Sequence, residues 1–135
     1  MEIKKNQFWV YYVGEKNEVN PEKNGKWMYF FSDSNYVTDI CTKAINENIV
    51  AVCKHTNNAD TGVACFYLNI DDNEGHRRVI KFFLDNNLIK RTKSGKLTNA
   101  SFKLDNQTRT GEYGDEFQAK LNLEKFVDLT TGEFI

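Results

Sequence analysis

The sequence has few of the residues that interrupt a compact fold. Its 135 residues include one proline, Pro21, and no apolar run of the roughly 20 residues that a membrane-spanning helix needs. The N-terminal stretch MEIKKNQFWVYYVGE has only a short apolar run, which does not fit the apolar core of a signal peptide. We therefore expect a single domain over residues 1–135, located in the cytoplasm and without a membrane segment.

The sequence also lacks a large net charge, and it lacks an even set of cysteines that would indicate disulfide bonds. A net charge of −1 provides no basic field for a long nucleic acid, so any anion site must be local. The three cysteines, Cys41, Cys53 and Cys65, are odd in number and lie in apolar stretches, which is typical of small buried thiols. We expect all three to be unpaired in a reducing compartment.

Metal and catalytic motifs are scarce. The sequence has two histidines, His55 and His76, and no paired C-x-x-C spacing. Glycine patterns of the Walker and dinucleotide-binding types are absent. Asp71, Asp72 and Glu74 with His76 could bind a divalent ion, but an acidic helix start explains the same residues. We expect no cofactor, metal or catalytic residue, and catalysis remains an alternative that no motif supports.

Two segments have the apolar spacing of amphipathic helices, and we predict helices near 37–48 and 73–87. Residues 32–34, Ser-Asp-Ser, offer caps for the first helix, and Asp71 and Asp72 offer caps for the second. The apolar stripe of the first helix consists of Val37, Ile40, Cys41, Ala44, Ile45 and Ile49. The stripe of the second consists of Val79, Ile80, Phe83, Leu84 and Leu88.

The remaining ordered segments are rich in aromatic and β-branched residues, which predicts strands. They are QFWVYYVG, KWMYFF, NIVAVCKHT, GVACFYLNI, ASFKLD and EFQAKLNLEKF. The last alternates apolar and polar residues, the pattern of a sheet with one buried face. The order β-β-α-β-β-α-β-β predicts a two-layer α+β fold, with an antiparallel sheet of about six strands and both helices on one face.

Strand alternation predicts what the second sheet face carries. If Phe102 and Leu104 point toward the helices, Lys103 points the other way, and Lys120 does the same if Ala119 is in the core. Some aromatic residues must share that face, because the strands hold more of them than a core of this size requires. Aromatic planes beside cations suit a flat heterocycle that carries phosphate.

The stretch KLDNQTRTGEY is the predicted wall of this anion site. The residues expected to supply charge or hydrogen bonds are Lys26, Lys54, Arg78, Lys103, Thr108, Arg109 and Tyr113. The residues expected to offer a stacking plane are Trp9, Tyr11 and Trp27. Each has an ordinary structural alternative: the tryptophans as core, the lysines and Arg78 as solvated surface, and TRTGEYG as a structural turn.

The segments FWVYYVGE, GKWMYFF, VCKHT, VACFYLNIDD, HRRVIKFF and SFKLDNQTRTGEYG resemble, in this order, the Bles family. These small domains of uncertain function share the fold of the messenger-RNA cap-binding translation initiation factor. The chain is also similar to uncharacterised proteins of phages and low-GC Gram-positive bacteria. The resemblance implies functional roles for Lys26, Trp27, Lys54, Lys103, Thr108 and Tyr113, and no catalytic residue.

Three function classes follow. The first is a non-catalytic binding module for a small phosphorylated ligand such as a nucleotide, which in a phage protein could sequester a nucleotide signal of host immunity. The second is a protein-interaction or homo-oligomer module that uses the aromatic sheet face. The third is single-stranded nucleic-acid binding, which would weaken steeply with added salt.

Overall fold

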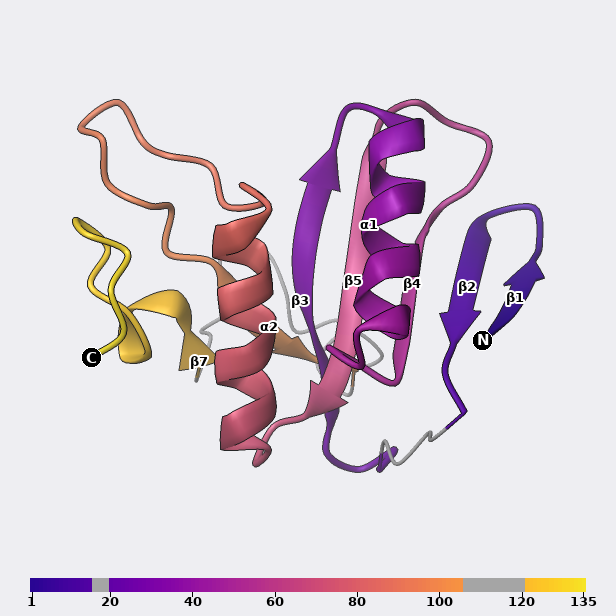
Figure 1. The fold of residues 1–135 in the computed structure, drawn as a ribbon, viewed down its shortest axis with the longest axis horizontal. Helices are drawn as coiled ribbons and strands as arrows, with labels where there is room; N and C mark the ends of the chain where they lie inside the picture. The colour runs from indigo at the N-terminus through magenta and orange to yellow at the C-terminus, as the bar shows by residue number, and fades with distance from the viewer. Residues whose placement is uncertain (16–19, 106–120) are drawn as a thin grey trace.

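The computed structural model describes residues 1–15, 20–105 and 121–135 (Figure 1). Its strands are β1 (Glu2–Lys5), β2 (Trp9–Val13), β3 (Asn24–Phe31), β4 (Val52–Thr56), β5 (Gly62–Asn69), β6 (Ser101–Leu104) and β7 (Leu121–Asn122). Its helices are α1 (Ser34–Asn46) and α2 (Asn73–Asp85), with a short 3-10 helix at Leu123–Lys125.

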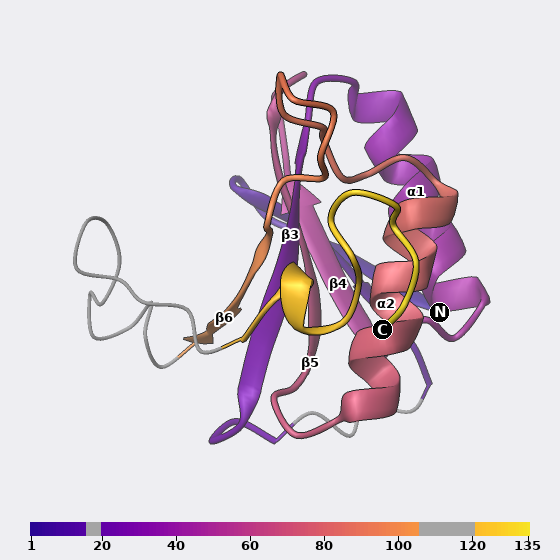
Figure 2. The same cartoon turned by 90° about the vertical axis from the view of Figure 1, so that its left-hand side faces the viewer.

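The strands of the described residues form one sheet in the order β1-β2-β4-β5-β3-β6-β7, and every neighbouring pair is antiparallel. Both α1 and α2 lie on the same face of this sheet, as the edge-on view in Figure 2 shows. The prediction of a two-layer α+β fold is therefore confirmed. The described residues form seven strands rather than about six, because β1 was not expected.

Side-chain caps set where the helices begin. The carboxylate of Asp33 accepts hydrogen bonds from the backbone N–H groups of Asn35 and Tyr36, so α1 begins three residues before the predicted start. The carboxylate of Asp72 accepts from the N–H of Gly75 at 2.9 Å and starts α2 at the predicted residue. In the part of the chain that the structure describes, neither helix is long and apolar enough to cross a membrane.

The core lies between the helices and the sheet. Its buried side chains include Val10, Tyr12, Trp27, Phe31, Val37, Ile40, Ala44, Phe66, Val79, Ile80, Phe83 and Phe102. The rings of Phe66 on β5 and Phe83 on α2 meet edge to face, 5.1 Å apart, and join the two layers. Cys41, Cys53 and Cys65 are buried and free, as the sequence predicted.

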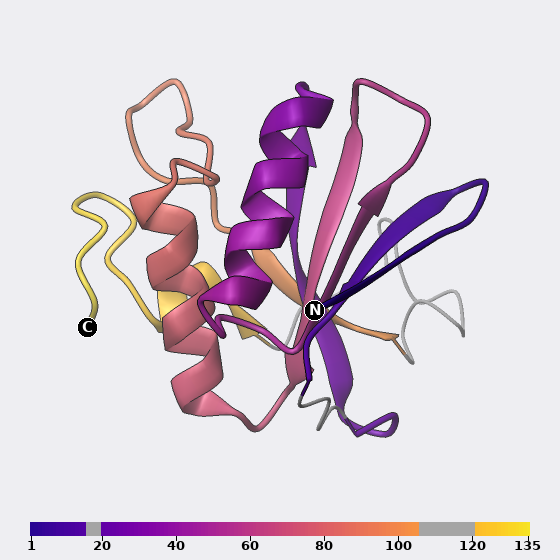
Figure 3. The same cartoon turned by 45° about the vertical axis from the view of Figure 1, so that its right-hand side comes forward.

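Strand β1 forms although only one of its four residues is apolar. It pairs with β2 across a turn in which the side-chain oxygen of Asn6 accepts from the N–H groups of Phe8 and Trp9, both at 2.8 Å. The side-chain amides of Asn57 and Asn58 donate to the backbone of the same turn. The hairpin at the outer edge of the sheet (Figure 3) therefore depends on asparagine contacts rather than on hydrophobic alternation.

The C-terminal strand ends earlier than predicted. Part of the expected strand over 116–126 lies outside the described residues, and the described part is a strand only at Leu121–Asn122. The backbone then turns into the 3-10 helix because Leu123 packs into the core while its N–H donates to the carbonyl of Ala100 at 2.8 Å. The backbone N–H of Glu124 donates to the side chain of Asn99 at 3.0 Å and holds the same turn.

Candidate anion site on the far face of the sheet

We call the sheet surface opposite α1 and α2 the far face. Trp27 and Phe66 are direct cross-strand partners under the helices, so the residues next to them, Lys26 and Tyr67, point to the far face. The register then aligns Lys103 on β6 with Lys26 in the same row. In the adjacent row it places Lys54 on β4 between Tyr11 and Cys65. We refer to Trp9, Tyr11, Lys26, Lys54, Tyr67 and Lys103 as the far-face cluster.

Lys54 is at the centre of this cluster. Its Nζ lies 3.8 Å from the centroid of the Trp9 ring, 5.5 Å from that of Tyr11 and 5.8 Å from that of Tyr67. Among the described residues, no carboxylate forms an ion pair with Lys54. The charge of Lys54 is therefore balanced mainly by ring faces, which attract cations but do not neutralise them.

Lys26 is buried beside this ring cluster. Its Nζ forms an ion pair of 2.9 Å with the carboxylate of Asp105 and lies 5.9 Å from the centroid of the Tyr67 ring. The side-chain amide of Asn24 donates to the other oxygen of the same carboxylate, also at 2.9 Å. Tyr67 is thus placed between two ammonium groups, Lys26 on one side and Lys54 on the other.

The electrostatics of the lysines reflect both burial and mutual repulsion. Burial lowers the pKa of Lys54, and the nearby charge of Lys26 lowers it further. Burial also lowers the pKa of Lys103, and Lys26 again adds to the effect. An anion bound between these groups would raise both pKa values by offsetting the repulsion. The far-face cluster is therefore suited to an anionic ligand.

Five of the residues predicted for the site share this face. Lys26, Lys54, Lys103, Trp9 and Tyr11 lie on four strands that are distant in sequence, and the sheet register brings them together. The predicted residues Thr108, Arg109 and Tyr113, and also Lys120, lie outside the described residues.

The prediction that Trp27 offers a stacking plane is wrong. Trp27 is one of the most buried side chains, and it points into the core beneath the helices. Its indole Nε1 donates a hydrogen bond of 3.0 Å to Nδ1 of His76, which satisfies the polar atom that a buried tryptophan carries. Lys26 and Trp27 are adjacent in a strand, so only one of them can face the far side.

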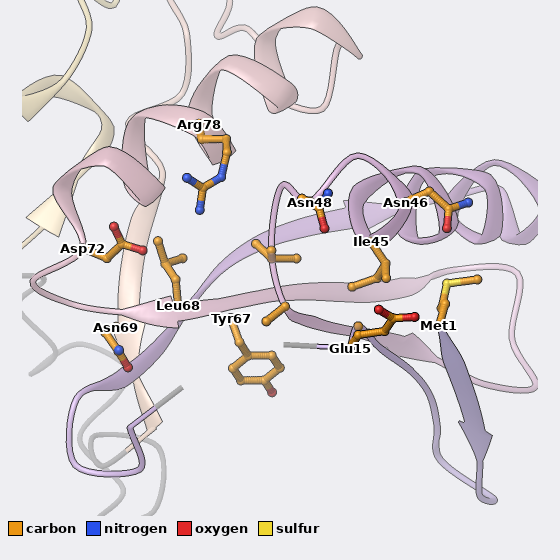
Figure 4. A pocket seen from close by; sticks show the side chains of 13 residues that line it. Met1, Glu15, Ile45, Asn46, Asn48, Tyr67, Leu68, Asn69, Asp72 and Arg78 are labelled. Atoms are coloured by element: carbon orange, nitrogen blue, oxygen red, sulfur yellow. The ribbon is translucent and has the colours of Figure 1, made fainter. Parts of the chain in front are cut away.

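The prediction that Arg78 supplies opposing charge is also wrong. Arg78 lies on α2, and its Nε donates to the backbone carbonyl of Ile49 at 2.9 Å. It lines a hollow of about 900 Å³ between the end of α1 and the start of α2, and Tyr67 also contributes to the lining of this hollow. Figure 4 shows the Tyr67 ring on the opposite side of the β5 ribbon from Arg78. A helix residue on one face of the sheet cannot join lysines on the other.

The hollow near Arg78 has a mixed chemical character. Glu15 and Asp72 bring carboxylates to its wall, while Arg78 brings a guanidinium group (Figure 4). The carboxylate of Asp72 is already used to cap α2. Because charges of both signs line this hollow, it is less suited to a phosphate group than the far-face cluster is.

Both histidines form hydrogen bonds with groups in the interior. Nε2 of His76 donates to the backbone carbonyl of Ile70 at 2.8 Å, while its Nδ1 accepts from Trp27. Nδ1 of His55 donates to the carbonyl of Thr56 at 2.9 Å, and its Nε2 shares a hydrogen bond of 2.9 Å with the hydroxyl of Tyr12. Within the described ranges, no three His, Cys, Asp or Glu side chains gather as metal ligands would.

The sequence prediction omitted two residues that shape this site. Tyr67 lies between Lys26 and Lys54, but its cross-strand neighbours depend on the register and cannot be derived from one strand alone. Asp105 pairs with Lys26. Strand alternation could have predicted its position, because it follows Lys103 by two residues in the predicted strand ASFKLD and so belongs to the same face.

The chain matches no family model and no curated protein.

Proposed function

We propose that the protein binds a small phosphorylated ligand, and specifically a nucleotide, at the far-face cluster. The observation that carries this proposal is the position of Lys54, whose ammonium lies among three aromatic rings while two further lysines share its face. Phosphate oxygens accept charge-assisted hydrogen bonds from such ammonium groups, and ring faces stack with a base. The roles of these residues are charge and stacking, not proton transfer.

The balance of charges favours a small ligand over a long nucleic acid. The chain has a net charge of −1 and so offers no overall positive field, whereas the lysines of the far-face cluster supply positive charge locally. A nucleotide needs only this local charge, whereas a long single strand would need a basic groove along its backbone. Sequestration of a nucleotide immune signal, which the resemblance to phage proteins suggests, is the cellular role we propose for such binding.

One observation favours a second function, a protein-interaction module. Phe30 on β3 is 60% exposed, and its alternation with Trp27 and Phe31 places it on the far face. An exposed aromatic residue on a sheet is typical of a surface that another protein covers. Phe30→Ser should weaken such a complex while leaving nucleotide binding unchanged.

A ligand screen with matched variants tests the nucleotide proposal. Mono-, di- and cyclic nucleotides would be screened by thermal shift, and each hit would be measured by calorimetry with Lys54→Ala and Lys103→Ala. We expect each substitution to weaken binding by roughly 10- to 100-fold, the effect of one charge-assisted hydrogen bond to phosphate. Lys81→Ala is the control, because Lys81 is exposed on α2 and pairs with Asp85.

Two results would exclude the proposal. One is that no phosphorylated compound binds more tightly than about millimolar, which corresponds to roughly 4 kcal/mol of binding free energy. The other is that the Lys54 and Lys103 variants bind as tightly as the Lys81 control. Lys26→Ala is less informative, because Lys26 is buried against Asp105 and its loss would also affect folding.

A further inference from the structure

Strand β1 ends the sheet, and among the described residues no strand pairs with its outer side. All four of its residues are exposed, and Ile3 is 47% exposed. An edge of this kind presents unpaired backbone N–H and C=O groups that can accept another strand. The asparagine contacts between the β1–β2 turn and residues 57–58 hold the edge in place, so little order would have to be gained on pairing.

The hydrogen-bond pattern identifies which groups point outward. The N–H of Asn6 donates to the carbonyl of Trp9 at 2.9 Å, one position beyond the Lys5–Val10 pair. Antiparallel ladders alternate, so Lys4 and Glu2 make the remaining backbone bonds to β2. The N–H and C=O groups of Ile3 and Lys5 therefore point away from the sheet.

We infer that β1 is a self-association edge that pairs antiparallel with β1 of a second copy, with Ile3 opposite Ile3 of that copy. The two-fold axis then passes between the two Ile3 residues, which exchange both of their outward backbone bonds. Lys5 faces Met1 of the other copy and makes the flanking bonds.

Charge selects this register from its neighbours. In the proposed pairing, Glu2 lies directly opposite Lys4 of the other copy, and the same contact occurs twice by symmetry. A shift of one strand by two residues in one direction would place Glu2 against Glu2, and a shift by two residues in the other direction would place Lys4 against Lys4. A register that pairs odd-numbered with even-numbered residues would invert one copy relative to the other. The far face of one copy would then lie on the same side of the continuous sheet as the helices of the other.

Each copy already contains the elements of this charge pattern. Lys4 and Glu2 of one chain lie 3.6 Å apart, on the same face of β1, and both are 65% exposed. The side chains of a second copy would approach the same pair from across the strand, at the close spacing of a non-hydrogen-bonded position. The result is one sheet that continues through both copies, with both far-face clusters on the same side.

Analytical ultracentrifugation of the full chain with charge-reversal variants tests this inference. In low salt and at rising concentration, we expect the average mass to increase from 15.7 kDa toward that of a dimer. Glu2→Lys and Lys4→Glu should each weaken association by about tenfold, because each replaces two attractive contacts with two repulsive ones. The double variant Glu2→Lys/Lys4→Glu should recover association to within about threefold of the parent.

Lys93→Glu is the matched control for Lys4→Glu, since it changes the net charge by the same amount at an exposed residue in the segment after α2, outside β1. Mixing Glu2→Cys copies with Lys4→Cys copies should give an intermolecular disulfide, while either variant alone should give little. A chain that stays monomeric at about 0.5 mM overturns the inference. So does a dimer that Lys4→Glu and Lys93→Glu weaken equally, or one that the double variant fails to restore.

Discussion

Nε1 of Trp27 and Nδ1 of His76 share a hydrogen bond of 3.0 Å that joins β3 to α2 within the core. An indole nitrogen can only donate, so Nδ1 of His76 accepts, and its Nε2 carries the proton that goes to the carbonyl of Ile70. The partners thus define a neutral histidine with one tautomer. A second buried histidine, His55, donates from Nδ1 to the carbonyl of Thr56, and burial lowers its pKa, which favours the neutral form.

Folding should therefore be sensitive to mild acid. Burial lowers the pKa of His76 and of His55 below the ordinary value of 6.5, so the unfolded chain takes up protons first as the pH falls. Their contribution is fully present above about pH 6.5 and is lost progressively as the pH falls through the lower pKa of the folded state. We expect the free energy of unfolding, measured in urea, to fall as the pH is lowered below 6.5, by at most about 1.4 kcal/mol per pH unit for each histidine.

His76→Phe separates this effect from general acid sensitivity. It leaves the indole N–H of Trp27 without its acceptor, so the variant should be less stable at pH 7.5 by about 1–3 kcal/mol. Its further loss on acidification should be smaller than that of the parent, because one of the two titrating groups is gone. An equal loss in both proteins would show that His76 does not contribute.

The ion pair between Lys26 and Asp105 should matter more for stability than the exposed pair between Lys81 and Asp85. The side chains of Lys26 and Asp105 are 11% and 29% exposed, against 68% and 58% for the exposed pair. Asp105→Ala leaves a buried ammonium without its carboxylate and should cost about 2–4 kcal/mol in chemical denaturation. Asp85→Ala should cost at most about 0.5 kcal/mol, and similar losses for the two variants would contradict this prediction.

Gly25 allows the close approach of β6 to β3. A Cβ at this position would overlap the ring of Phe102 and lie 2.9 Å from the carbonyl oxygen of Lys103. Gly25→Ala should therefore destabilise the fold by about 1–3 kcal/mol, as overpacking does. In a Phe102→Leu background the added cost should be smaller, although the backbone contact remains. Equal costs in the two backgrounds, measured by thermal unfolding, would show that Phe102 is not the obstacle.

The affinity for a phosphorylated ligand should begin to fall at a lower pH than it would if Lys54 and Lys103 had the usual lysine pKa. The pKa values of Lys54 and Lys103 are lowered by burial, so both lose their protons below the usual 10.5. We expect calorimetric affinity to decrease progressively as the pH is raised from 7.5 toward 10.5, and binding to take up protons because the anion raises both pKa values. Heats measured in two buffers with different ionisation enthalpies would reveal the uptake; affinity that is constant over this range would contradict the prediction.

The thiols should react only after unfolding. Burial raises the pKa of Cys65. The pKa of Cys53 is also raised, mainly by the neighbouring Cys41 and further by burial. A thiol reagent should count three groups in denaturant without reductant and react slowly with all three in the native protein. A count of one in denaturant would instead indicate an internal disulfide.

Local periodicity was enough to predict the architecture. The apolar stripe from Val37 to Ile45 and the stripe around Val79 and Phe83 define two amphipathic helices, and both are buried where the spacing predicted. Alternation within single strands placed Lys103 opposite to Phe102, and that prediction holds because the period of a strand is a local property of the backbone.

Which face each strand buries, and what lies beside it, was decided only by the tertiary structure. Trp27 could have faced either way until the register placed it over His76, and Arg78 could have joined the lysines until α2 packed on the other side of the sheet. Strand β1 was not predicted because its stability depends on β2 and on contacts from Asn57 and Asn58, which are distant in sequence. The sequence by itself determined the periodic elements, since hydrophobic spacing acts over a few residues. The site required the sheet register, because its cations and rings come from strands that meet only after the chain has folded.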